Sequence, residues 1–153
     1  ADLPEVVLDD VPHAREHCLE VQLPFLKMIL GHVSIVPLVV GNVEPATVAR
    51  VVERLWGGPE SLIILSTDLS HYLAYGEAQS RDAMTAAAIE ALDGSQLTPE
   101  DACGAHALAG FLAAARARRM AIKRLDLRNS GDTAGSRDRV VGYGAWILRE
   151  IAG

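Results

Sequence analysis

The stretch "LIILSTDLSHY", residues 62–72, joins an apolar run to a cluster of hydrogen-bonding side chains. The apolar run predicts a strand over residues 61–65, in the centre of a sheet because polar side chains do not interrupt it. In an open α/β sheet, ligands bind beyond the carboxyl ends of the strands. Ser66, Asp68 and His71 would lie at such a place and are candidate site residues. The alternative is that Ser66, Thr67 or Asp68 caps a following helix and that His71 lies on the surface.

The rest of the chain alternates short apolar runs with amphipathic runs of helical length, which is typical of an α/β protein. Besides the strand at 61–65, this pattern predicts strands over residues 33–40, 121–127 and 140–148. It predicts helices over residues 42–58, 77–92 and 104–120. We therefore expect a single α/β domain over residues 1–153, with helices flanking the sheet.

Composition and charge narrow the class of protein. Of the 153 residues, 50% are hydrophobic and 22% are charged, which is ordinary for a globular chain. The formal net charge of −6 argues against nucleic acid as a partner, because phosphate contacts need clustered Lys and Arg. No apolar stretch reaches the roughly 18 to 20 residues that span a bilayer. Two cysteines provide no disulfide framework, which suits a reducing cytoplasm.

Cys103 stands at the expected start of the helix over residues 104–120, three positions before His106. A thiol there feels the positive end of the helix dipole, which favours the thiolate, the form that binds metals or attacks carbon. Residues three apart on a helix can also face one point. The alternative is that Cys103 is a small buried residue, as most free cysteines are.

The segment "REHCLEVQLPFL", residues 15–26, combines His17 and Glu20 with an apolar helical stripe. These two residues can share one face of a helix. One interpretation is an imidazole that a carboxylate orients near the site. The other is a solvated acidic face on a helix that ends before Pro24.

Four motifs, in order, together carry a family resemblance: "EHCLEVQLPFL", "STDLSHY", "CGAHAL" and "NSGDTAGSRDRVVGYGA". From about Val7 to Trp146 the chain resembles the Memo family, called AmmeMemoRadiSam system protein B in prokaryotes. The resemblance implies a fold similar to the LigB-type class III extradiol dioxygenases, with helices on both faces of an α/β sheet and a non-haem iron site. For Memo proteins it implies a metal held by two histidines and one cysteine, with an aspartate and a further histidine close by.

Carried onto this sequence, the resemblance makes Cys103 the cysteine ligand and makes Asp68 and His71 the neighbouring pair. His17 falls on a family histidine, followed here by Cys18 in place of the usual serine. The chain departs from the family at Ala107-Leu108, where the family reads Pro-Ile. The segments that resemble "PHAGY" and "GPNH" and carry the two metal-binding histidines are also absent from this sequence.

The chain thus resembles the C-terminal part of a Memo protein with its N-terminal portion missing. We expect a fragment, a processed product or one half of a split protein. A homo-oligomer that covers the open sheet edge is the other expectation, because an unpaired edge strand invites pairing.

The first functional hypothesis is a Memo-like metal-binding protein on a dioxygenase-type scaffold. Cysteine with imidazoles suits iron, copper or zinc, and we expect iron or copper rather than zinc. A structural zinc site made of His17, His71, Cys103 and His106 would lack the paired short spacings of known zinc motifs. If the protein is an enzyme, we expect an oxidoreductase, with redox or dioxygenase-related chemistry on an unknown small-molecule substrate. Asp68 and His71 would then transfer protons.

Two other classes remain open. The chain could be a hydrolase with Cys103 as nucleophile, His71 or His106 as base and Asp68 to orient the imidazole. It could also be a non-catalytic interaction or signalling module, and that module should tolerate changes at Cys103, Asp68 and His71. In the Memo-like hypothesis, Ser66, His17, Glu20 and His106 are expected to line the site.

Overall fold

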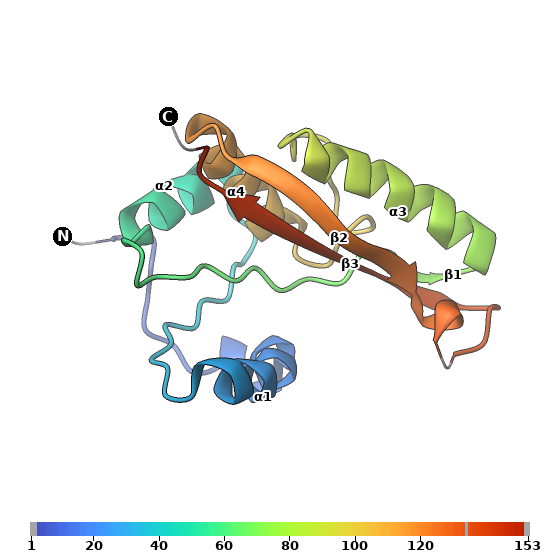
Figure 1. The fold of residues 1–153 in the computed structure, drawn as a ribbon, viewed down its shortest axis with the longest axis horizontal. Coiled ribbons are helices and arrows are strands. Elements are labelled where there is room, and N and C mark those ends of the chain that lie inside the picture. Colours follow the sequence, from blue (N-terminus) through green and yellow to red (C-terminus); the bar gives the residue numbers. More distant parts are fainter. Residues whose placement is uncertain (1–2, 134, 152–153) are drawn as a thin grey trace.

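The structure is a computed structural model that describes residues 3–133 and 135–151. The described residues form four α-helices and three strands, drawn in Figure 1. In chain order the elements are α1 (Cys18–Leu30), α2 (Pro45–Leu55), β1 (His71–Leu73), α3 (Tyr75–Glu90), α4 (Ala105–Ala117), β2 (Ala121–Asn129) and β3 (Val140–Arg149), with short 3-10 helices at Pro12–Arg15 and Ser130–Asp132. The α/β class expected from the sequence is confirmed.

The sheet is antiparallel, in the order β1-β3-β2, so β3 is its central strand. β2 and β3 pair along their lengths, from Ala121 opposite Arg149 to Asn129 opposite Gly142. The strands expected over residues 121–127 and 140–148 are therefore confirmed. The expected helices over residues 42–58, 77–92 and 104–120 also appear, each a few residues shorter, as α2, α3 and α4.

The core lies where α3 and α4 meet the sheet. Leu69, Ile89, Leu108 and Leu112 are buried together there, and Ile122, Leu127 and Trp146 of the sheet pack against them. Such burial of aliphatic side chains is the main favourable term in folding. α2 covers α4 from the other side, and a Cβ on Gly110 would collide with Val48 of α2. The absence of a side chain at Gly110 is what allows these two helices to approach.

The strands expected over residues 33–40 and 61–65 are wrong for this structure. Both segments are irregular, and no described residue pairs with either in a ladder. Most of their side chains are also exposed, although Leu65 packs against the core: Val36 keeps 76% of its surface and Leu62 keeps 70%. A strand needs a hydrogen-bonded neighbour as well as apolar side chains, and the described residues supply none.

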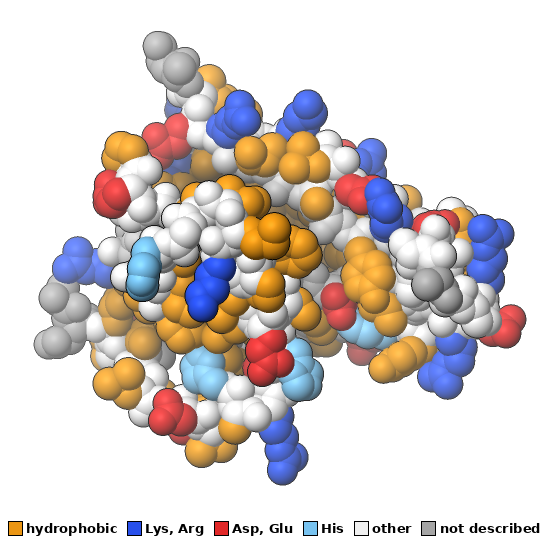
Figure 2. Space-filling model, turned by 60° about the horizontal axis from the view of Figure 1, so that its bottom comes forward, with side chains coloured by type: hydrophobic (Ala, Val, Ile, Leu, Met, Phe, Trp, Pro, Cys, Tyr) orange, Lys and Arg blue, Asp and Glu red, His pale blue; other side chains and the backbone are white. Residues whose placement is uncertain are grey.

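The helix expected to end before Pro24 continues to Leu30, so that expectation is also wrong. Pro24 removes one backbone hydrogen bond without ending α1, and the helix stops at Gly31, whose φ of 70° suits glycine. α1 contains no buried residue. Figure 2, which brings the α1 side forward, shows hydrophobic side chains gathered over much of this face. Within the described ranges, no helix has the length and apolar character needed to cross a membrane.

Candidate functional site

Cys103 meets residues 66–68 at the N-terminal end of α4. The backbone N–H of Asp68 donates to the Cys103 sulfur at 3.3 Å, and the hydroxyl oxygen of Thr67 lies 3.3 Å from the same sulfur. The backbone N–H of Cys103 donates in return to the Asp68 carbonyl at 3.3 Å. Cys103 is exposed and has no disulfide partner, which leaves its thiol accessible to a ligand.

Thr67 is a site residue that the sequence reasoning did not select. Its hydroxyl oxygen accepts a hydrogen bond from the backbone N–H of Gly104 at 2.8 Å and donates one to the Asp68 carbonyl at 2.9 Å. Gly104 is the N-cap of α4, where backbone donors need an acceptor from outside the helix. A hydroxyl in the polar run was a capping signal. The Thr67 hydroxyl caps α4 and not α3, which is the next helix along the chain. The local sequence therefore could not identify its partner.

Asp68 and His71 form a pair, as expected. The His71 Nε2 atom lies 3.4 Å from the Asp68 carboxylate, and their side chains are 30% and 49% exposed. The pair sits where β1 begins, and the ladder with β3 contains an irregularity between His71 and Leu73. Tyr72, at that irregularity, has φ of 59°, a conformation that non-glycine residues rarely adopt. Such bulges often redirect a side chain beside a site.

A cavity of about 470 Å³ opens beside Asp68. It is lined by Val21 and Gln22 of α1, by Leu65, Ser66, Thr67 and Asp68, and by Tyr143 and Gly144 of β3. The Gln22 amide donates to the Ser66 hydroxyl at 3.5 Å, which links α1 to the loop. The volume falls in the range of small-molecule sites, roughly 300 to 1,000 Å³.

The other predicted site residues lie outside this arrangement. His17 and Glu20 do pair, with 3.0 Å between Nδ1 and the carboxylate, but both side chains are largely exposed at 81% and 72%. No hydrogen bond or ion pair among the described residues links them to Cys103 or to residues 66–71. Cys103 precedes the N-cap of α4, so it and His106 do not share a helix as expected.

The side chains at this site provide few of the donors that a metal ion needs. Within residues 3–133 and 135–151, no group of three or more His, Cys, Asp or Glu side chains is arranged to hold a metal. Transition metals prefer several converging nitrogen and sulfur ligands. The described residues therefore do not by themselves make a complete centre, and Cys103 offers one ligand.

The hydrolase alternative requires an imidazole at the nucleophile. The hydrogen bonds of the Cys103 sulfur go to Thr67 and to the backbone of Asp68. His71 faces the Asp68 carboxylate instead. This geometry gives the Cys-His-Asp hydrolase no particular support.

The sequence profile of the Memo-like protein family matches residues 3–147. The chain belongs to the Memo-like family. Its similarity to a "MEMO1 family protein" of Thermotoga maritima is 34% identity over 150 residues, covering 92% of this chain and 53% of that protein. A second relative, a "MEMO1 family protein" of Aeropyrum pernix, is 36% identical over 152 residues, covering 92% of this chain and 54% of the relative.

These family relationships extend over most of this chain but not over most of the relatives. The "MEMO1 family protein" of Archaeoglobus fulgidus is 29% identical over 160 residues, which cover 96% of this chain and 61% of that protein. The chain thus spans about half the length of the first curated relatives that it matches. Activities and partners of the longer Memo-like proteins therefore do not transfer directly to this chain.

Proposed function

We propose that this chain is the part of a Memo-like metal-binding protein that supplies the cysteine ligand and a proton-transferring pair. The observation that carries the proposal is the convergence of Thr67, Asp68 and Cys103. The exposed sulfur contacts Thr67 and Asp68, which both line the cavity of about 470 Å³, and Asp68 in turn faces His71. Sulfur and imidazole ligands suit iron, copper and zinc, and the proposal takes iron or copper. Either of the first two metals would supply redox chemistry when bound.

In this proposal Asp68 and His71 hold and move a proton at the mouth of the cavity. The Nε2 atom of His71 faces the Asp68 carboxylate, so the carboxylate fixes which ring nitrogen carries the proton. The cavity takes a small molecule, and Gln22 and Tyr143 on its walls offer polar contacts. The chemistry at this site would be redox or dioxygenase-related.

We further propose that the missing ligands come from another polypeptide segment. It packs on the exposed hydrophobic side chains of α1 and of residues 33–40, called here the open apolar face. Two features support this. First, residues 33–40 read as a strand buried on both faces, yet Val36 and Ile35 remain 76% and 43% exposed. Second, about half of each longer relative lies outside the match. We propose that this segment is an N-terminal half of the same fold. The alternative is that a second copy of this chain packs on the same surface.

The free cysteines support a reducing compartment, and we propose the cytoplasm.

The proposed metal site is tested on protein purified from its source cells without added metal or chelator. Intact mass spectrometry identifies the polypeptides present. Elemental analysis gives the number of iron, copper and zinc ions bound per 153-residue chain. We expect near-stoichiometric iron or copper together with additional polypeptide. Cys103→Ser should lose the metal, whereas Cys18→Ser, the matched control, should retain it.

The competing outcomes are distinct. Metal that persists in Cys103→Ser would overturn the ligand assignment. A metal-free protein that still carries a bound polypeptide would favour the non-catalytic interaction module, for which the exposed apolar face is the supporting observation. Stoichiometric metal in a homodimer of the 153-residue chain would identify a second copy as the occupant of the open face.

A further inference from the structure

Asp82 is a buried acid that the proposed function does not use. It lies in the middle of α3 and is only 3% exposed. Its Oδ1 atom accepts a hydrogen bond from the backbone N–H of Ser70 at 3.0 Å. A carboxylate removed from water must find donors in the protein, because an unpaired buried charge is costly. This one takes its donor from the segment that carries Asp68 and His71.

The geometry of Ser70 explains why a hydrogen-bond acceptor is needed at this place. The backbone N–H of Leu69 donates to the Gly142 carbonyl at 2.9 Å, and the Gly142 N–H donates to the Ser70 carbonyl at 2.8 Å. Those two bonds tie residues 69–70 to β3. The Ser70 N–H is not part of this exchange with β3, and it is buried with the rest of the residue. Asp82 supplies its acceptor and so holds the segment from the side of α3.

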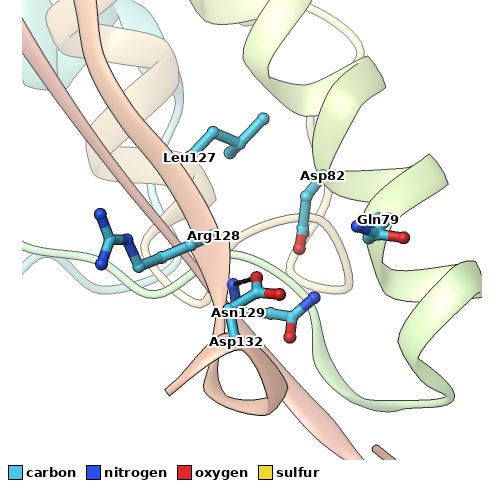
Figure 3. A pocket seen from close by; sticks show the side chains of 6 residues that line it. All are labelled: Gln79, Asp82, Leu127, Arg128, Asn129 and Asp132. Atoms are coloured by element: carbon cyan, nitrogen blue, oxygen red, sulfur yellow. Dashed lines mark hydrogen bonds between the residues drawn. The ribbon is translucent and has the colours of Figure 1, made fainter.

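β3 packs directly against the acid. A Cβ on Gly142 would overlap the Asp82 carboxylate, so glycine is what lets the strand come this close. Asp82 also borders a cavity of about 130 Å³ between α3 and β2, shown in Figure 3. In this cavity the Asp82 side chain comes from α3 and the Asn129 side chain from β2 on the opposite wall. Asn129 is 2% exposed. The carboxylate is therefore confined by packing on one side and borders a small polar space on another.

We propose that Asp82 is a positioning residue for the Asp68–His71 pair. Ser70 lies two residues after Asp68 and one before His71, so its backbone orientation sets where both side chains start. Immediately beyond, Tyr72 adopts a positive φ, and such a conformation persists only where the surroundings hold the backbone in place. The Asp82–Ser70 hydrogen bond supplies that constraint before the irregular step.

This inference rests on the proposed function for its significance, but its test does not require metal. The test measures two quantities by nuclear magnetic resonance in the metal-free protein: the hydrogen-exchange rate of the Ser70 amide, and the ¹⁵N shifts of the two His71 ring nitrogens at a pH where the imidazole is neutral. The ring shifts report which nitrogen carries the proton, which depends on the partner at Nε2. Asp68→Ala calibrates the shifts for a histidine that has lost its partner.

Two substitutions at Asp82 separate its hydrogen-bonding role from bulk. Asp82→Leu removes the acceptor while keeping the same branching of the side chain, and Asp82→Asn keeps an acceptor oxygen. Thr85→Val is the matched control, because Thr85 lies on the same helix, is 2% exposed, and its hydroxyl donates to the Arg81 carbonyl within that helix. If Asp82→Leu does not fold, Asp82→Ala carries the same expectation without crowding Gly142.

We expect Asp82→Leu to speed Ser70 exchange at least tenfold and to move the His71 shifts at least half-way to their values in Asp68→Ala. Asp82→Asn and Thr85→Val should stay near the wild type in both measurements. Unchanged His71 shifts in Asp82→Leu, or equal changes in Thr85→Val, would overturn the inference. Failure to find metal in the native protein would instead count against the proposed function and leave these shifts to be judged separately.

Discussion

The backbone N–H of Asp68 donates a hydrogen bond to the sulfur of Cys103 at 3.3 Å, although 35 positions separate these residues in the sequence. The reciprocal bond from the Cys103 N–H to the Asp68 carbonyl makes this a two-way junction between the polar loop and the start of α4. The junction fixes the sulfur relative to the Asp68–His71 pair. Any ligand held by the sulfur would therefore lie close to a group able to move a proton.

Thr67→Val tests the contribution of this junction to stability. The change removes the acceptor of the Gly104 N–H while keeping nearly the same side-chain shape. We expect the free energy of unfolding to fall by about 1 to 2 kcal/mol, the usual cost of a lost hydrogen bond with an unsatisfied partner. Urea denaturation measures this loss. Ser80→Ala is the control, since its exposed hydroxyl bonds only within α3, and a loss of equal size there would contradict the assignment.

Gly142→Ala should be far more damaging than its single methyl suggests. The new Cβ would overlap the Asp82 carboxylate, so β3 or α3 must shift. We expect a loss of about 1 to 3 kcal/mol, typical of overpacking. The paired variant is Gly76→Ala in α3, where a Cβ meets nothing within 4 Å. It should be neutral or stabilising by up to about 1 kcal/mol, because alanine favours helix. Thermal unfolding of both variants compares them, and similar losses would argue against the close approach.

Asp132 should make the fold sensitive to acid. The Tyr75 hydroxyl donates to its carboxylate at 2.5 Å and the Asn129 N–H donates at 2.9 Å. The Tyr75 bond, followed by the backbone bond, holds the pKa of Asp132 below its usual value. A lowered folded-state pKa contributes stability that is present above the unfolded value of about 3.9 and is lost as pH falls through the folded value.

The measurement is the free energy of unfolding as pH falls from about 6 to below the unfolded pKa of about 3.9. Asp132→Asn should show a smaller loss of stability over this range than the wild type. Tyr75→Phe keeps the carboxylate but removes the largest cause of the shift, so its loss should lie between the two. An Asp132→Asn variant as acid-sensitive as the wild type would show that other carboxylates dominate.

Hydrogen exchange should separate the open segments from the sheet. In the 153-residue chain alone, the amides of residues 33–40 should exchange within seconds, because no described residue accepts their hydrogen bonds. Those of β2 that face β3 should be protected by orders of magnitude. In protein purified from source cells with its additional polypeptide, residues 33–40 should become protected. Equal exchange in the two preparations would remove the support for an occupant at this face.

Several features of this protein could be predicted from the sequence because they depend on nearby residues. The helical periodicity before Leu92 and after Gly104 predicted α3 and α4, and the apolar runs at 121–127 and 140–148 predicted β2 and β3. Asp68 and His71 are three positions apart, so their pairing depended only on the local backbone. Local propensity and short loops sufficed for these elements.

Tertiary structure decided what depends on distant partners. The same apolar pattern that predicted β2 also predicted strands at 33–40 and 61–65, but a ladder needs a neighbour, and no described residue provides one there. Sequence spacing could not predict two further hydrogen bonds, from the Gly104 N–H to Thr67 and from the Ser70 N–H to Asp82. Each of these bonds joins residues that are brought together only by packing. The sequence alone thus determined the family and the candidate side chains, whereas the tertiary structure decided which of them meet. Hydrogen bonds and burial depend on proximity in space, which a local pattern does not encode.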